Sequence, residues 1–127
     1  MKSISTKGKF FNKGTVTVNV PVILFREDNT QIVYCPALDL SGSGNTIVEA
    51  QESFATVVAE YINYTTNKGT LWTDLKKLGW VIKKGKQKPA MPPPMSELLE
   101  SNDEFSRVFD SLPYKKFDTG VNLPAYA

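Results

Sequence analysis

The sequence predicts a small α+β domain in which an antiparallel sheet forms one layer and one main packed helix forms the second. Two patterns predict this class. Apolar residues alternate from Thr15 to Phe25, and a stripe of apolar residues at three- and four-residue steps follows Thr46. The length of 127 residues and the 41% of hydrophobic residues suit one domain with one core.

Three strands are expected before the main helix. The first covers 15–25, where valine or leucine occupies every second position. Pro21 has no amide N–H to donate, so we expect this strand to lie at a sheet edge or to be interrupted there. A polar turn at 27–30 and a second strand at 31–35 complete an antiparallel hairpin, and a third, short strand is expected at 40–45.

Two helices and a short strand should follow. Thr46 and Glu49 form a capping box, in which the threonine hydroxyl accepts a bond from the Glu49 amide and the carboxylate reaches back to the Thr46 amide. Thr70 can begin a second, shorter helix that Gly79 ends, and 80–82 is a short apolar strand. The predicted element order is therefore β-β-β-α-α-β.

Composition changes after this region, because prolines and lysines become frequent. Pro92 to Pro94 favour an extended spacer, a helix is expected at 96–112 that Asn102-Asp103 can divide, and 114–127 is expected to be irregular. The chain then divides into a flexible N-terminal arm (1–14), the α+β domain (15–84), and a proline-rich linker with a C-terminal extension (85–127).

Residue content argues against an enzyme. Histidine is absent, which removes the commonest general base near neutral pH and the commonest zinc ligand. Cys35 is the single cysteine and ends an apolar strand, so we expect a buried structural thiol and no internal disulfide. The spacing of Asp39, Glu49 and Asp74 gives no reason to expect that they meet. We expect no catalytic residue, cofactor or metal site.

No apolar run approaches the ~20 residues of a membrane span, and no apolar run follows the basic start of the chain as in a secretory signal. We therefore expect no membrane association and, by default, a cytoplasmic location.

The net charge of +2 conceals an uneven distribution. Between 15 and 75 there are two cations and seven acids, whereas between 75 and 96 there are lysines and no acid. This basic patch can bind phosphate backbone in a salt-dependent way, contact an acidic partner, or simply remain solvated. Its members are Lys76, Lys77, Lys83, Lys84, Lys86 and Lys88.

The middle of the chain carries a run of motifs from Ile32 to Ala50 whose order and spacing resemble the HicB family of antitoxin-like proteins. The resemblance covers about residues 16–66: a strand enters Pro-x-Leu, a short strand follows, and a Gly-Asn-Thr turn leads to Glu-Ala at the opening of a helix. The matching positions are Pro36, Leu38, Gly44, Thr46, Glu49 and Ala50.

The resemblance implies a β-β-β-α-β core related to double-stranded-RNA-binding-like and partial RNase-H-like folds, and it implies no catalysis. Family members typically neutralise a small RNA-cleaving toxin by binding it, and many repress their own operon through a C-terminal DNA-binding module. Residues 89–127 lack the adjacent amphipathic helices that a helix-turn-helix needs.

We therefore expect a non-catalytic protein-binding module that neutralises a small toxin protein or acts as a solitary HicB-like regulator. The alternative is a nucleic-acid-binding regulatory protein that uses the Lys76–Lys88 basic patch. An edge strand and an apolar tail also favour a homodimer.

Overall fold

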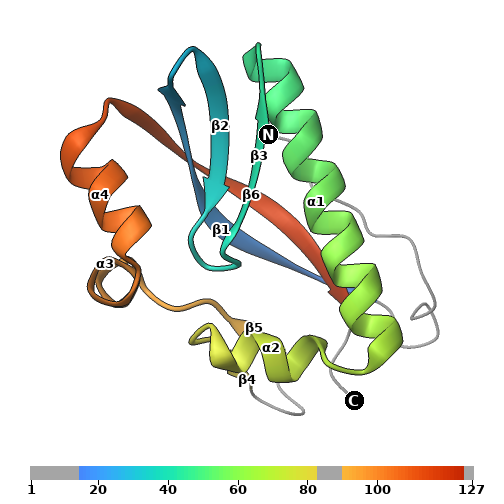
Figure 1. The fold of residues 1–127 in the computed structure, drawn as a ribbon. Helices are drawn as coiled ribbons and strands as arrows, with labels where there is room; N and C mark the ends of the chain where they lie inside the picture. Colours follow the sequence, from blue (N-terminus) through green and yellow to red (C-terminus); the bar gives the residue numbers. More distant parts are fainter. Residues whose placement is uncertain (1–14, 83–89, 125–127) are drawn as a thin grey trace.

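A computed structural model describes residues 15–82 and 90–124 of the chain, and these form an α+β fold (Figure 1). The α+β class and the antiparallel sheet are as predicted. The sheet has four strands in the order β3-β2-β1-β6, and β4 and β5 pair separately. The elements are β1 (Thr15–Glu27), β2 (Thr30–Cys35), β3 (Leu40–Gly44), α1 (Ile47–Lys68), α2 (Leu71–Lys77), β4 (Val81–Ile82), β5 (Ala90–Met91), α3 (Met95–Ser101), α4 (Asp103–Ser111) and β6 (Tyr114–Pro124).

Strands β1 and β2 form the predicted hairpin. Asp28 and Asn29 both have positive φ, 53° and 64°, which is the twist that a tight two-residue turn requires. The β1–β2 ladder runs from Ile23 to Glu27 on β1, so Pro21 lies just outside it. The expectation that β1 lies at an edge or is interrupted at Pro21 is wrong, because β1 is a continuous central strand in which Pro21 pairs with Asp118 of β6.

The fourth strand of the sheet is β6, and our expectation that this segment is irregular is wrong. It pairs with β1 in antiparallel register from Thr15 opposite Pro124 to Phe25 opposite Tyr114. The short strand expected at 80–82 exists as β4, but it pairs with β5 and not with the main sheet. Residues that follow the proline-rich stretch therefore complete the sheet that the first strands begin.

Helix α1 covers one face of the sheet along β3 and β2 (Figure 1). Its fully buried side chains recur every four residues, as the apolar stripe predicts: Ala50, Phe54, Val58 and Ile62. The helix begins at the predicted cap, where the Thr46 hydroxyl accepts from the Glu49 amide at 3.1 Å. The Glu49 carboxylate accepts from the Asn45 amide, not from that of Thr46 as we expected.

Glycines in β3 allow α1 to lie close to the sheet. A Cβ atom on Gly42 would lie 2.5 Å from Cα of Phe54 and 2.8 Å from the carbonyl carbon of Ser53. A Cβ atom on Gly44 would lie 2.9 Å from the amide nitrogen of Ala50. Real Cβ atoms do not approach backbone so closely, so these glycines set the distance between helix and sheet.

Helices α3 and α4 contact the opposite face, which adds a partial third layer to the two that we predicted. The Asn102 side chain, between the two helices, donates to the Tyr34 hydroxyl on β2 at 2.6 Å. Val33 pairs with Gly42, and Gly42 faces α1. Successive side chains of a strand point to opposite faces, so the next residue, Tyr34, points to the face away from α1. Asn102 divides the predicted helix as expected, and its side chain caps α4 by accepting from the Phe105 amide. No helix among the described residues is long and apolar enough to cross a membrane.

Candidate partner-binding groove

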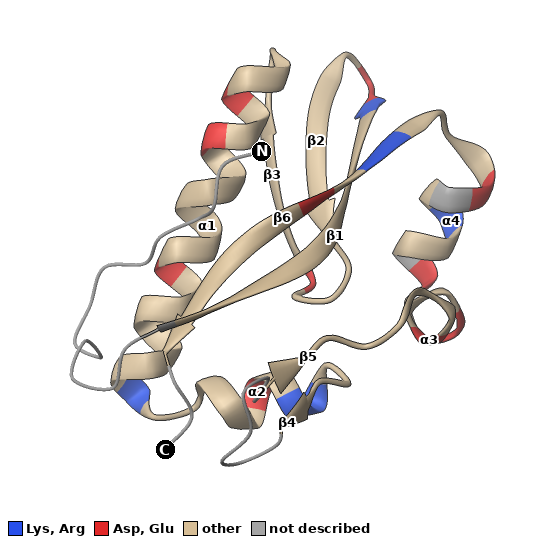
Figure 2. Ribbon diagram, turned by 180° about the vertical axis from the view of Figure 1, so that it is seen from behind, with Lys and Arg blue, Asp and Glu red and all other residues tan. Residues whose placement is uncertain are grey.

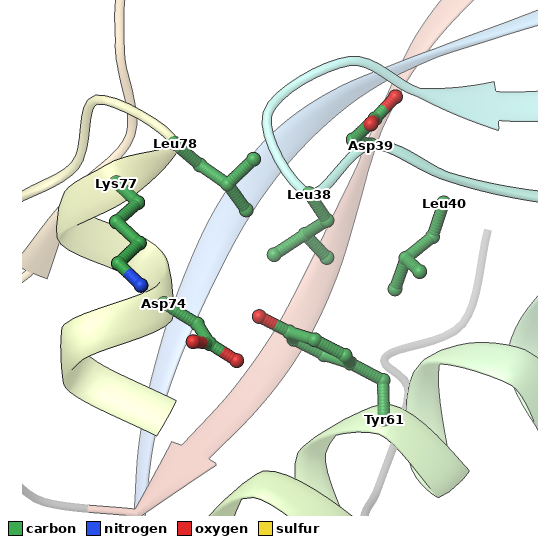
Figure 3. A pocket seen from close by; sticks show the side chains of 7 residues that line it. All are labelled: Leu38, Asp39, Leu40, Tyr61, Asp74, Lys77 and Leu78. Carbon is green, nitrogen blue, oxygen red and sulfur yellow. The ribbon is translucent and has the colours of Figure 1, made fainter. Parts of the chain in front are cut away.

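The candidate site is a groove around the turn between β2 and β3, residues 36–39. It consists of two adjoining hollows whose common walls are Asp39, Lys77 and Leu78. The first hollow has a volume of about 310 Å³ and is completed by Leu38, Leu40, Tyr61 and Asp74 (Figure 3). The second has a volume of about 350 Å³ and is completed by Pro36, Leu98, Ser101, Asn102 and Asp103.

Backbone and side-chain hydrogen bonds hold the turn in place. The Leu38 amide donates to the Cys35 carbonyl and the Asp39 amide to the Pro36 carbonyl, both at 3.3 Å. The indole N–H of the buried Trp80 donates to the Ala37 carbonyl at 2.7 Å. Asp39 has φ of 53°, a left-handed conformation that aspartate tolerates better than most residues. The turn is therefore held by bonds within itself and by the bond from Trp80, so this wall of the groove is preorganised.

A chain of hydrogen bonds links the turn to the α3–α4 junction. The Tyr34 hydroxyl donates to Oδ1 of Asp39 at 2.8 Å and accepts from the Asn102 amide group at 2.6 Å. Burial is the main reason that the pKa of Tyr34 lies well above its usual value. The Tyr34 hydroxyl therefore stays protonated and continues to donate to Asp39, which holds the Asp39 side chain at the rim of both hollows.

The first hollow combines leucine side chains with four polar side chains, those of Asp39, Tyr61, Asp74 and Lys77. Tyr61 on α1 and Asp74 on α2 point toward each other across it, and the Lys77 ammonium lies beside Asp74 (Figure 3). The Tyr61 hydroxyl oxygen is buried and has no hydrogen-bond partner within the described structure. Burial and, secondarily, the Asp74 carboxylate raise the pKa of Tyr61 to about 12. A neutral hydroxyl with unused bonding capacity thus faces a carboxylate.

The structure places only part of the predicted basic patch. Lys76 and Lys77 are exposed on α2, and Lys77 lines both hollows. The remaining four lysines, Lys83, Lys84, Lys86 and Lys88, lie outside the described residues. Figure 2 shows carboxylates along α1 and around α3 and α4, whereas the lysines of α2 lie between these regions.

The residues that carry the HicB resemblance divide into two groups. Pro36 and Leu38 are buried in the turn and line the groove. The others form the junction between β3 and α1: Gly44, Thr46, Glu49 and Ala50. Their roles in helix approach, capping and core packing are structural.

Sequence reasoning missed most of the groove. Asp39 and Asp74 gave no sign in their spacing of lying near each other, yet both line the first hollow. Tyr61 belongs to the apolar stripe of α1, and no sequence pattern marks its hydroxyl as unpaired. Within the described residues no three metal-ligating side chains come together. Comparison of this chain with known protein families, with curated proteins and with solved structures gave no match.

Proposed function

We propose that this protein is a non-catalytic protein-binding module of the antitoxin-like, HicB-like type, which neutralises a small RNA-cleaving toxin. The observation that carries the proposal is the position of Pro36 and Leu38. Both belong to the run of residues that resembles the HicB family, and both line the groove. The motif that suggests the family thus coincides with a hollow surface of the described structure.

The chemistry of the groove supports binding over catalysis. Cys35 adjoins the turn, but it is fully buried, and desolvation raises the pKa of its thiol to about 12. A thiol with such a pKa is a poor nucleophile at neutral pH, and the sequence has no histidine to activate it. The groove offers leucine surface and carboxylates, which are groups that recognise a partner.

The charge of the groove supports a basic partner. Asp39, Asp74 and Asp103 line it, and Lys77 is its only cation among the described residues. A protein that cleaves RNA must attract phosphates and therefore carries a basic surface. Carboxylates on this chain would complement that surface and speed association.

The test begins with the reading frames that adjoin this gene: if one encodes a small basic protein, the two are co-expressed, and the lack of any such reading frame would refute the toxin-neutralising role. We expect a stable complex on size-exclusion chromatography and relief of the growth arrest that the small protein causes alone. Asp103→Lys should weaken the complex about tenfold or more because it reverses a charge at the groove. Glu52→Lys on α1, outside the groove, is the matched control and should bind as the unaltered chain does. An adjoining protein that neither binds nor is neutralised, or equal loss in both variants, would refute the proposal.

We propose as a second candidate that the basic patch binds nucleic acid. The exposure of Lys76 and Lys77 on α2 favours it, because four more lysines follow within the next eleven residues of the sequence. Such binding would depend steeply on salt concentration.

A further inference from the structure

We propose that the hollow between Tyr61, Asp74 and Leu38 is a socket for one arginine side chain of a basic partner protein. This inference rests on the proposed function and names the group that the groove would recognise. It follows from the shape of the hollow, from its unpaired hydroxyl and from its charge.

The shape suits a long side chain with an apolar stem. Leu38, Leu40 and Leu78 supply the apolar lining, and the volume of about 310 Å³ exceeds the ~30 Å³ share of a single water several times. Arginine places its methylene groups on apolar surface and keeps its charged end at polar groups. Leu40 on β3 and Leu78 at the end of α2 are half-buried and would contact these methylenes, whereas Leu38 has almost no exposed surface.

The polar groups of the hollow suit a planar donor with several N–H groups. Asp74 offers two carboxylate oxygens, which a guanidinium can bind with two parallel hydrogen bonds. The Tyr61 hydroxyl oxygen is buried without a partner among the described residues, and a small rotation of its side chain toward the hollow would let it accept a further N–H from the same ligand. A buried hydroxyl without a hydrogen bond is unfavourable, and an incoming donor would remove this penalty.

The balance of charge favours a cation over an anion. Asp74 is the carboxylate that faces the hollow, because the Asp39 carboxylate accepts from Tyr34 and points away from Tyr61 and Asp74 (Figure 3). Asp39 and Asp74 together still outnumber the one ammonium of the lining, that of Lys77, so a cation is favoured over a carboxylate. Lys77 is exposed and lies on a flexible stem, so its ammonium can move aside when a cation binds Asp74. An incoming lysine would only replace one point charge with another, whereas the arginine fork can reach Asp74 and Tyr61 at once.

The probe is a tripeptide with a central arginine, blocked at both ends, titrated into the ¹⁵N-labelled protein and followed by NMR. Peptides with lysine, norleucine or glutamate at the same position serve as comparisons. We expect shifts centred on Leu38, Tyr61 and Leu78, and binding by the arginine peptide at least several-fold tighter than by the others. No shift up to about 50 mM peptide, or equal binding of the norleucine peptide, would overturn the proposal.

Variants test which groups bind the arginine. Asp74→Asn should weaken binding about tenfold or more, and Tyr61→Phe should weaken it several-fold. Lys77→Met should strengthen binding because it removes the competing ammonium. Glu52→Gln changes the net charge by the same amount as Asp74→Asn but lies outside the hollow, so it should have no effect.

Each variant must first show the dispersed amide spectrum of the folded chain. If Asp74→Asn fails to fold, the opposite effects of Tyr61→Phe and Lys77→Met decide the question, and their absence refutes the socket. The peptide titration needs no toxin, so the socket can fail while co-expression still yields a complex. It can equally succeed when no adjoining protein binds.

Discussion

Replacement of Gly42 by alanine tests how closely α1 lies on the sheet. The added Cβ would lie 2.5 Å from Cα of Phe54 and 2.8 Å from the carbonyl carbon of Ser53, whereas ordinary contacts of this kind are at least 3.4 Å. Both neighbours are helix backbone, so no side-chain rotation can relieve the overlap. The helix must move by about an ångström, the difference between these distances, and the core beneath it must loosen.

The magnitude follows from what lies under this part of the helix. Phe54 and Val58 are fully buried, and a shift of their helix opens gaps around both side chains. Overpacking against a rigid neighbour typically lowers the free energy of unfolding by about 1–3 kcal/mol, and backbone overlap belongs at the upper end, about 3 kcal/mol or more. This is a large fraction of the about 5–15 kcal/mol that stabilises an ordinary domain.

Urea denaturation followed by circular dichroism measures this change. Ser41→Ala is the matched control, because Ser41 is an exposed residue of the same strand and should stay within about 0.5 kcal/mol of the unaltered chain. A Gly42→Ala protein as stable as the Ser41→Ala protein would refute the close approach of α1 to β3.

Four further predictions concern other parts of the molecule. Asn102→Ala removes both the cap of α4 and the bond to Tyr34, and should lower the free energy of unfolding by about 1–2 kcal/mol; an unchanged urea midpoint would contradict this. Because burial raises the pKa of the Cys35 thiol from 9.0 to about 12, its contribution to the free energy of unfolding should be complete below pH 9 and fall by up to about 1.4 kcal/mol per unit as the pH rises toward 12, in addition to the loss from Tyr34 and Tyr61. Cys35→Ala should flatten that fall, and an equal slope in both proteins would count against the assignment. The alternate amides of β6 that bond to β1 should exchange hydrogen as slowly as the β1 amides that bond to β6, since the two strands pair along eleven positions; fast exchange of all β6 amides would show that it is an appendage. If the basic patch binds nucleic acid, a labelled duplex should show salt-dependent binding to the unaltered chain by fluorescence anisotropy. Changing Lys83, Lys84, Lys86 and Lys88 to glutamate should abolish this binding, and binding that persists would exclude the patch.

Local patterns were sufficient for the first half of the fold. The alternation in β1 and the turn at Asp28 and Asn29 predict the hairpin because each signal depends only on neighbouring residues. The cap at Thr46 and the four-residue stripe likewise predict α1 with its start correctly placed. In each case the residues that determine the structure are adjacent in sequence.

The closing strand and the groove depend on distant residues, and local patterns could not predict them. In β6, Lys115, Lys116 and Gly120 break the apolar alternation, and the strand forms because β1 supplies its partner. The groove likewise requires β2, α1, α2 and the α3–α4 junction to meet around one turn. The Tyr61 hydroxyl is buried without a partner because of how these elements pack together, and its neighbours in sequence do not determine this.

The pairing of β1 with β6 has a consequence for how the protein is made. The first residue of β1, Thr15, pairs with the last residue of β6, Pro124, so the sheet cannot close until all residues up to Pro124 have left the ribosome. Contacts between such distant residues slow folding because a long loop must be ordered before they form. Until then the β6-facing edge of β1 lies open to other nascent chains. Prompt association with a partner or a chaperone during synthesis would therefore protect this edge at the time of its greatest exposure.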